Sequence, residues 1–194
     1  MRFFIAVWVV SCAVACGGGK SATGPSGGFP APPQIQTIVE VNSPGGFPYG
    51  PQVLAQSVTV PAGSYNNIRF RWGLGQLGPP ASGSLYILSQ EVLGNVSGLG
   101  PSTPGFVARS LRITDGDYIF DSAVTLRGAA RYWFATDTAI YFMSSQGSSD
   151  VYTGGDLYVA ANPPLDGPFQ RLYVSNPSER FDANFKLTGS VATQ

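Results

Sequence analysis

Three aspartates that lie close together in the chain could bind a metal ion. Asp115 and Asp117 flank Gly116, and Asp121 follows them. Carboxylate oxygens are the ligands that Ca²⁺ prefers in proteins. An Asp-Gly pair is also typical of a β-hairpin turn, and the glutamate that ends a calcium-binding loop is missing. We therefore predict a turn, with calcium as the less favoured alternative, and no other cofactor.

Aromatic side chains are the second group of residues that could contact a ligand. Sugar rings present apolar C–H faces, which stack on flat aromatic rings. Tyr49, Tyr65 and Tyr152 lie in or beside segments where glycine, proline and small residues predict loops. We expect these tyrosines to be exposed and to be candidate glycan contacts. Trp72 and Trp133 lie within β-forming segments, and we expect them in the core.

The composition argues against several kinds of chemistry. The chain has no histidine, which removes the commonest general base, the Ser-His-Asp triad and most zinc sites. Glycoside hydrolysis needs two carboxylates facing each other, and no recognisable pair is present. Eleven basic residues balance eleven acidic ones, so no basic surface for nucleic acid is expected. We predict that the protein is not an enzyme, with a hydrolase as the third choice.

The segments that must position these residues are short and β-forming. From Gln34 onward they alternate with Gly, Pro, Asn and Asp, and no long stretch has helical periodicity. The clearest strand is the last, where Phe181, Ala183, Phe185 and Leu187 share one face. The predicted strands are Ile35–Val41, Val53–Val60, Ile68–Trp72, Leu85–Leu88, Val107–Ile113, Tyr118–Phe120, Val124–Arg127, Tyr132–Ala135, Ile140–Ser144, Leu157–Ala160, Leu172–Val174 and Ala183–Thr188. This pattern predicts an all-β fold, an antiparallel β-sandwich of jelly-roll type, over residues 34–194.

The N-terminus is typical of an export signal. Arg2 precedes an apolar run from Phe3 to Ala15, which is shorter than the roughly 20 residues of a membrane-spanning helix. Ala13-Val14-Ala15-Cys16 resembles the lipobox of bacterial lipoproteins, in which signal peptidase II cuts before a cysteine that carries diacylglycerol. The resemblance implies a signal peptide at residues 1–15 and lipidation of Cys16, so that the membrane is a partner.

Two alternatives to this interpretation stay open. Val9-Val10-Ser11-Cys12 also fits a lipobox, and Ala13-Val14-Ala15 fits an ordinary signal peptidase site, which would release a soluble secreted protein. The lipoprotein interpretation is favoured because residues 17–33 form a Gly/Ser-rich and then Pro-rich tether. Lipidated Cys16 and this tether make up residues 16–33. Gly17 is not the aspartate associated with retention in the inner membrane, so we expect the outer membrane.

Three later segments carry a family resemblance. These segments are Leu54–Gly63, the strand Ser84–Leu88 with its glycine loop to Pro101, and the hairpin Val124–Phe134. They resemble exported bacterial β-sandwich domains that open on an "AQSFTVPAG" segment and occur with varied cell-envelope anchors, the choice-of-anchor type. Such domains are similar in outline to carbohydrate-binding modules. The resemblance covers most of residues 53–187 and implies a jelly-roll-like fold without catalytic residues.

Together these observations predict an envelope-anchored lipoprotein whose β-sandwich is a non-catalytic surface binding module. Glycans are the favoured ligands. The alternative is a structural or assembly component of the envelope that binds protein partners.

Overall fold

The computed structural model describes residues 32–43, 46–73, 81–145, 151–160, 166–172 and 181–192. The chain divides into two units, Met1–Pro32 and Pro33–Gln194, and the described strands belong to the second. In the described residues, the secondary structure consists of β-strands and one short 3₁₀ helix, η1 (Val96–Gly98). No helix in this part of the chain is long and apolar enough to cross a membrane.

The strands are short and pair antiparallel throughout. In chain order they are β1 (Gln36–Val41), β2 (Phe47–Gln52), β3 (Leu54–Thr59), β4 (Ser64–Trp72), β5 (Leu85–Leu88), β6 (Phe106–Arg109), β7 (Arg112–Thr114), β8 (Asp117–Ile119), β9 (Leu126–Arg127), β10 (Arg131–Thr136), β11 (Ile140–Ser144), β12 (Leu157–Ala160), β13 (Phe169–Arg171) and β14 (Phe185–Val191).

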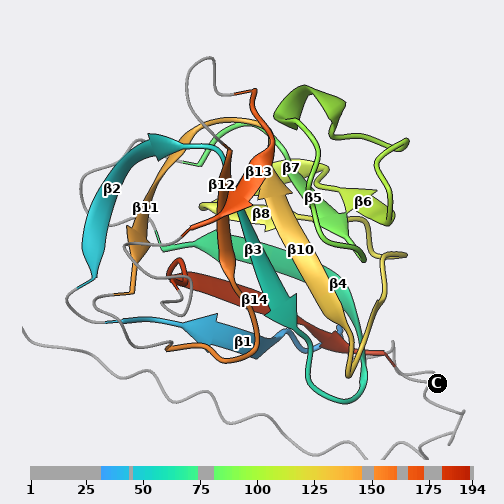
Figure 1. Cartoon of the computed structure of the whole chain (residues 1–194). Helices are drawn as coiled ribbons and strands as arrows, with labels where there is room; N and C mark the ends of the chain where they lie inside the picture. Colours follow the sequence, from blue (N-terminus) through green and yellow to red (C-terminus); the bar gives the residue numbers. More distant parts are fainter. Residues whose placement is uncertain are drawn as a thin grey trace, which may run out of the picture. The chain divides into compact units, whose positions relative to one another are not determined.

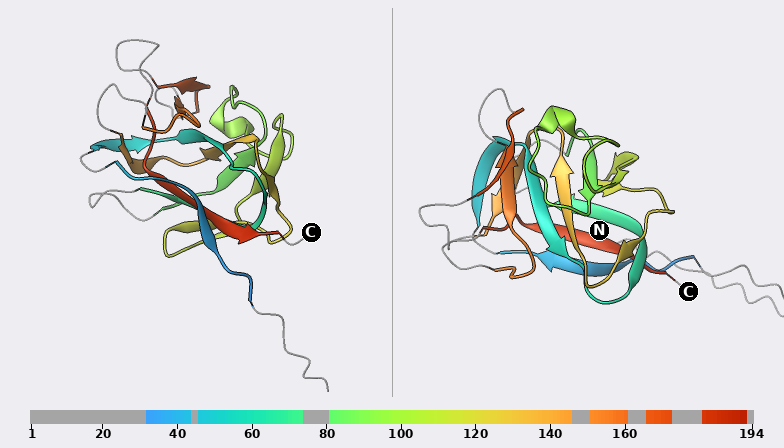
Figure 2. Two further views of the ribbon diagram at one scale, coloured as in Figure 1. Left: turned by 90° about the horizontal axis from the view of Figure 1, so that it is seen from below. Right: turned by 45° about the vertical axis from the view of Figure 1, so that its right-hand side comes forward.

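These strands build two large sheets and a two-stranded ribbon. The first sheet has the order β1-β14-β4-β8-β7, and β9 also pairs with β4. The second sheet has the order β13-β12-β3-β10-β5-β6, and the ribbon is β11-β2. The two large sheets lie one over the other (Figures 1 and 2), with strands β3 and β10 facing β4 and β14.

The strand order identifies this sandwich as a jelly roll. Eight strands form its frame, namely β1, β3, β4, β5, β6, β8, β10 and β14. If these eight strands are numbered 1 to 8 along the chain, the first sheet has the order 1-8-3-6, which is β1-β14-β4-β8. The second sheet has the order 2-7-4-5, which is β3-β10-β5-β6. Two Greek keys folded into one sandwich produce this order. The predicted antiparallel jelly-roll sandwich is confirmed, and β12 and β13 extend its second sheet beyond β3.

The main core lies between the sheets and is rich in aromatic rings. Phe70 of β4 stacks on Phe134 of β10 at 4.6 Å and on Phe185 of β14 at 5.5 Å, and meets Trp72 edge-on at 4.8 Å. All four side chains are almost completely buried. Of these contacts, the one between Phe70 and Phe134 joins the two sheets. Burying each aromatic side chain stabilises the fold, because it removes a large apolar area from water.

A second apolar cluster covers the outer face of the second sheet. Tyr158, Leu88 and Ala135 point outward from β12, β5 and β10, and the half-buried ring of Trp133 packs against this cluster. The loop between β5 and β6 supplies the buried side chains Val92 and Val96, which close over these residues. This loop therefore forms a partial third layer, and its margin borders β12 and the edge strand β13.

Candidate functional site

The predicted aspartate cluster is a β-hairpin turn. Asp115 and Gly116 connect β7 to β8 with φ values of +52° and +84°, as a tight two-residue hairpin turn requires. The Asp117 carboxylate accepts a 2.6 Å hydrogen bond from Arg71, and Asp121 accepts one of 2.9 Å from the backbone N–H of Ala123. Across the residues that the structure describes, no three His, Cys, Asp or Glu side chains are grouped to hold a metal ion.

The expectation that Tyr65 is exposed is wrong. Its side chain belongs to the main core and is only 8% exposed, and its hydroxyl donates to the carbonyl of Ala62 at 3.1 Å. Tyr65 and Ile68 would face opposite sides of a regular strand. Asn67, with φ +50°, lies between them, where the pairing of β4 with β14 is irregular. As a result, Tyr65 and Ile68 both face inward. Local irregularity of the strand therefore buries Tyr65.

The other two predicted tyrosines are half-buried and already engaged in contacts. The ring of Tyr49 stacks on Phe142 at 5.0 Å. The Tyr152 hydroxyl accepts from the N–H of Thr59 at 3.0 Å and donates to its carbonyl at 3.1 Å, and the ring meets Phe185 edge-on. These contacts give both tyrosines a packing role. Cys16 lies outside the described residues.

A surface cavity lies beside β12 and the edge strand β13, and we call it the β12–β13 pocket. It encloses about 550 Å³. Its walls come from the loop after β5 and from β12 and β13, and its lining residues are Glu91, Leu93, Tyr158, Phe169, Gln170 and Arg171. The lining combines apolar and aromatic groups with a carboxylate, an amide and a guanidinium, as small-ligand sites commonly do.

The polar groups of the β12–β13 pocket meet at Tyr158. Its hydroxyl donates a 2.7 Å hydrogen bond to the Glu91 carboxylate, and the Arg171 guanidinium lies 5.9 Å from the centre of its ring. Burial raises the pKa of Tyr158, and the hydrogen bond to Glu91 raises it further, although Trp133 and Arg171 oppose the shift. At neutral pH the phenol is therefore protonated and holds Glu91 in place.

A buried carboxylate fixes the position of Arg171. Asp156, only 1% exposed, lies 3.4 Å from the Arg171 guanidinium and 3.8 Å from that of Arg131. The Asp156 N–H donates to the Ser57 hydroxyl at 2.8 Å, which connects β12 to β3. Arg171 is thus held between a carboxylate and an aromatic ring, so little side-chain freedom remains for a ligand to remove.

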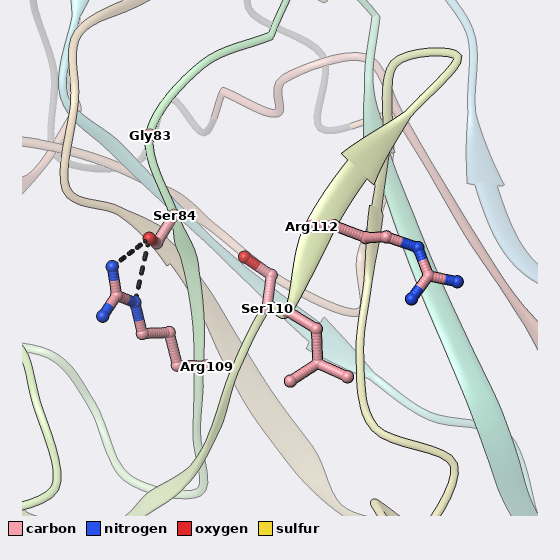
Figure 3. A pocket seen from close by; sticks show the side chains of 6 residues that line it. Gly83, Ser84, Arg109, Ser110 and Arg112 are labelled. Atoms are coloured by element: carbon pink, nitrogen blue, oxygen red, sulfur yellow. Dashed lines mark hydrogen bonds between the residues drawn. The ribbon is translucent and has the colours of Figure 1, made fainter.

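A second cavity of about 410 Å³ lies where the chain passes from β6 in the second sheet to β7 in the first. We call it the Arg109 pocket, and its lining residues are Gly83, Ser84, Arg109, Ser110, Leu111 and Arg112. The Arg109 guanidinium donates to the Ser84 hydroxyl through Nε at 2.9 Å and Nη2 at 2.7 Å (Figure 3). Figure 3 also shows that Arg112 extends away from these two residues.

Sequence reasoning found neither pocket. Each is assembled from segments far apart in the chain, so no linear motif marks it. One signal was available for the first pocket: in Leu157–Ala160 the alternation of the strand places Tyr158 and Leu157 on opposite faces. With Leu157 in the core, Tyr158 has to point outward from the sandwich.

Comparison with protein-family models, with curated proteins and with solved structures found no match to this chain. The resemblance to choice-of-anchor domains therefore stays a prediction.

Proposed function

We propose that this protein is a non-catalytic, envelope-anchored binding module and that the β12–β13 pocket is its glycan site. The observation that carries the proposal is the convergence of Glu91, Arg171 and Gln170 on one surface cavity beside the apolar side chain of Leu93. Cys16 would carry the lipid anchor and residues 16–33 the tether.

The chemistry of the lining suits a sugar. A carboxylate accepts hydrogen bonds from sugar hydroxyls, whereas a guanidinium and an amide N–H donate to their oxygens. Leu93 is 66% exposed and offers an apolar surface for the C–H face of a ring. The lining holds one acidic and one basic residue, which favours a neutral ligand over a charged one.

Binding to a glycan array tests this proposal directly. The mature domain should bind at least one class of neutral glycan. Glu91→Gln and Arg171→Gln should each weaken that binding about tenfold, because a hydrogen bond to a charged group is lost. Arg69→Gln is the matched control. The Arg69 side chain is exposed on the first sheet and has no hydrogen-bond or ion-pair partner among the described residues, so this variant should bind as the unmodified protein does.

Two outcomes would contradict the proposal. An array with no bound glycan would favour the alternative, a structural or assembly component that binds envelope proteins. Exposed apolar side chains on separate loops, such as Leu93, Leu111 and Val151, are the feature that favours this alternative. Cleavage of an array glycan would instead favour a hydrolase.

A further inference from the structure

The Arg109 pocket differs from the β12–β13 pocket in the sign of its charge. Two arginines line it and no acidic residue does. Among the described residues, no carboxylate lies within ion-pair distance of Arg109 or Arg112. Both of these side chains are exposed. The positive charge of the pocket is therefore not neutralised by an ion pair.

The side chains of this pocket are arranged as hydrogen-bond donors. The Ser84 hydroxyl oxygen accepts two bonds from Arg109, and the Ser110 hydroxyl oxygen accepts one of 3.0 Å from the N–H of Leu85. Each hydroxyl keeps its proton to donate. A guanidinium carries five N–H groups, and Arg109 uses two of them on Ser84, which leaves three without an acceptor among the described residues.

Arg109 is held in place before any ligand arrives. Its guanidinium is fixed by the paired bonds to Ser84 and lies 5.8 Å from the centre of the Tyr86 ring. Ser84 is itself held, because its N–H donates to the Asp137 carboxylate at 2.7 Å. A fixed, planar guanidinium is the group best suited to a two-point contact with an oxyanion.

The nearby Asp137 carboxylate does not cancel this arrangement. It is not among the residues that line the pocket, and it accepts hydrogen bonds from the Ser84 N–H, the Tyr86 hydroxyl at 3.3 Å and the Thr138 hydroxyl at 3.0 Å. These three donors stabilise its charge locally. The Arg109 guanidinium and the Ser84 and Ser110 hydroxyls are not among these donors, so they remain available to a ligand in the pocket.

We infer that the Arg109 pocket binds an oxyanion, meaning the sulfate, phosphate or carboxylate group of a ligand, through Arg109, Ser84 and Ser110. Arg112 adds positive charge at the rim. This site is separate from the β12–β13 pocket, so it does not depend on the proposed glycan function.

Nuclear magnetic resonance titration of the domain tests the inference, with the Arg109 Nε–H signal as the readout. Three probes distinguish the source of the oxyanion: inorganic phosphate, a sulfated oligosaccharide, and vesicles that contain an anionic phospholipid. At least one probe should shift the signal in a saturable way. Arg109→Gln should weaken that binding about tenfold, measured by calorimetry, since a charge-assisted bond is lost. Ser110→Ala and Arg112→Gln should weaken it less.

Arg69→Gln is again the control, because it removes the same charge from another exposed site. Thermal melts identify any variant that is not folded. If Arg109→Gln does not fold, Ser110→Ala becomes the decisive variant, because it removes only a hydroxyl. The inference is wrong if no probe binds. It is also wrong if Arg69→Gln and Arg109→Gln weaken binding equally, because general surface charge would then explain the effect.

Discussion

Arg171 is the residue on which the proposed glycan site depends most. Its guanidinium is held by Asp156 at 3.4 Å and by the Tyr158 ring at 5.9 Å. A ligand that accepts a hydrogen bond from Arg171 does not have to restrict a freely rotating side chain, which lowers the entropic cost of binding. Because Asp156 also lies near Arg131, the same carboxylate links β10, β12 and β13 at this position.

Tyr118 gives the fold a defined response to alkaline pH. Burial, with help from the Asp137 charge, raises the pKa of Tyr118 to about 12. In the unfolded chain the same phenol ionises near pH 10. Stability from this group is therefore complete below pH 10 and is lost as the pH rises toward 12, by about 2–3 kcal/mol.

Denaturant unfolding of the native protein and of Tyr118→Phe, measured at several pH values from 10 to 12, tests this prediction. The phenylalanine variant has no phenol to ionise, so its stability should fall less steeply over this range. The same decline in both proteins would contradict the assignment.

Single residues also show where sequence reasoning succeeds and where it fails. The alternation that places Phe185 and Leu187 in the core is correct, because β14 is regular there. For Tyr65 the expectation fails, because Asn67 changes which residues of β4 face inward. A positive φ at a non-glycine residue depends on its neighbours in the folded sheet, which the local sequence does not specify.

At the level of elements, the strand pattern predicts most of the sheets but not where the chain changes sheet. The predicted strand Val107–Ile113 is two strands, β6 and β7, that belong to different sheets. The sequence does not predict β2, because its segment contains Pro48, Gly50 and Pro51. β13 spans Phe169–Arg171, just before the predicted Leu172–Val174, of which only Leu172 is described.

The contact between β12 and β3 requires a glycine at position 155. A Cβ atom on Gly155 would overlap the carbonyl group of Ser57, and Ser57 belongs to β3. Gly155→Ala should therefore push β12 outward and destabilise the domain by about 1–3 kcal/mol, as overpacking does. It should also weaken glycan binding, since Tyr158 and Arg171 move with β12 and β13.

Gly98→Ala is the matched control, because a Cβ at Gly98 meets no atom within 4 Å. Thermal unfolding of the two variants gives the comparison. Equal melting temperatures would show that the close contact at Gly155 does not limit the position of β12.

On the scale of the whole molecule, the fold class follows from local patterns and the pockets do not. Short alternating segments and turn residues are enough to predict an antiparallel sandwich. The β12–β13 pocket, by contrast, needs Glu91 from one loop to meet Tyr158 and Arg171 from two later strands. The contact between these three residues depends on how β12 and β13 extend the second sheet, and no short sequence pattern encodes it.

The proposed lipid anchor at Cys16 gives a prediction for the full chain. If Cys16 carries lipid, Cys16→Ala should release the protein from the membrane fraction into the soluble fraction, because the fatty acyl chains provide the attachment. Cys12→Ala is the control and should stay in the membrane fraction. Mass spectrometry of the N-terminal peptide gives the independent measurement, and an unmodified thiol at Cys16 would contradict lipidation.

The central claim is that a neutral glycan binds at the edge of the second sheet. Chemical-shift mapping of the domain with a glycan selected on the array tests this most directly. The account predicts that the largest backbone shifts lie at residues 91–93 and 169–171, and that Glu91→Gln reduces them. Shifts located elsewhere on the sandwich, or unchanged in Glu91→Gln, would contradict it.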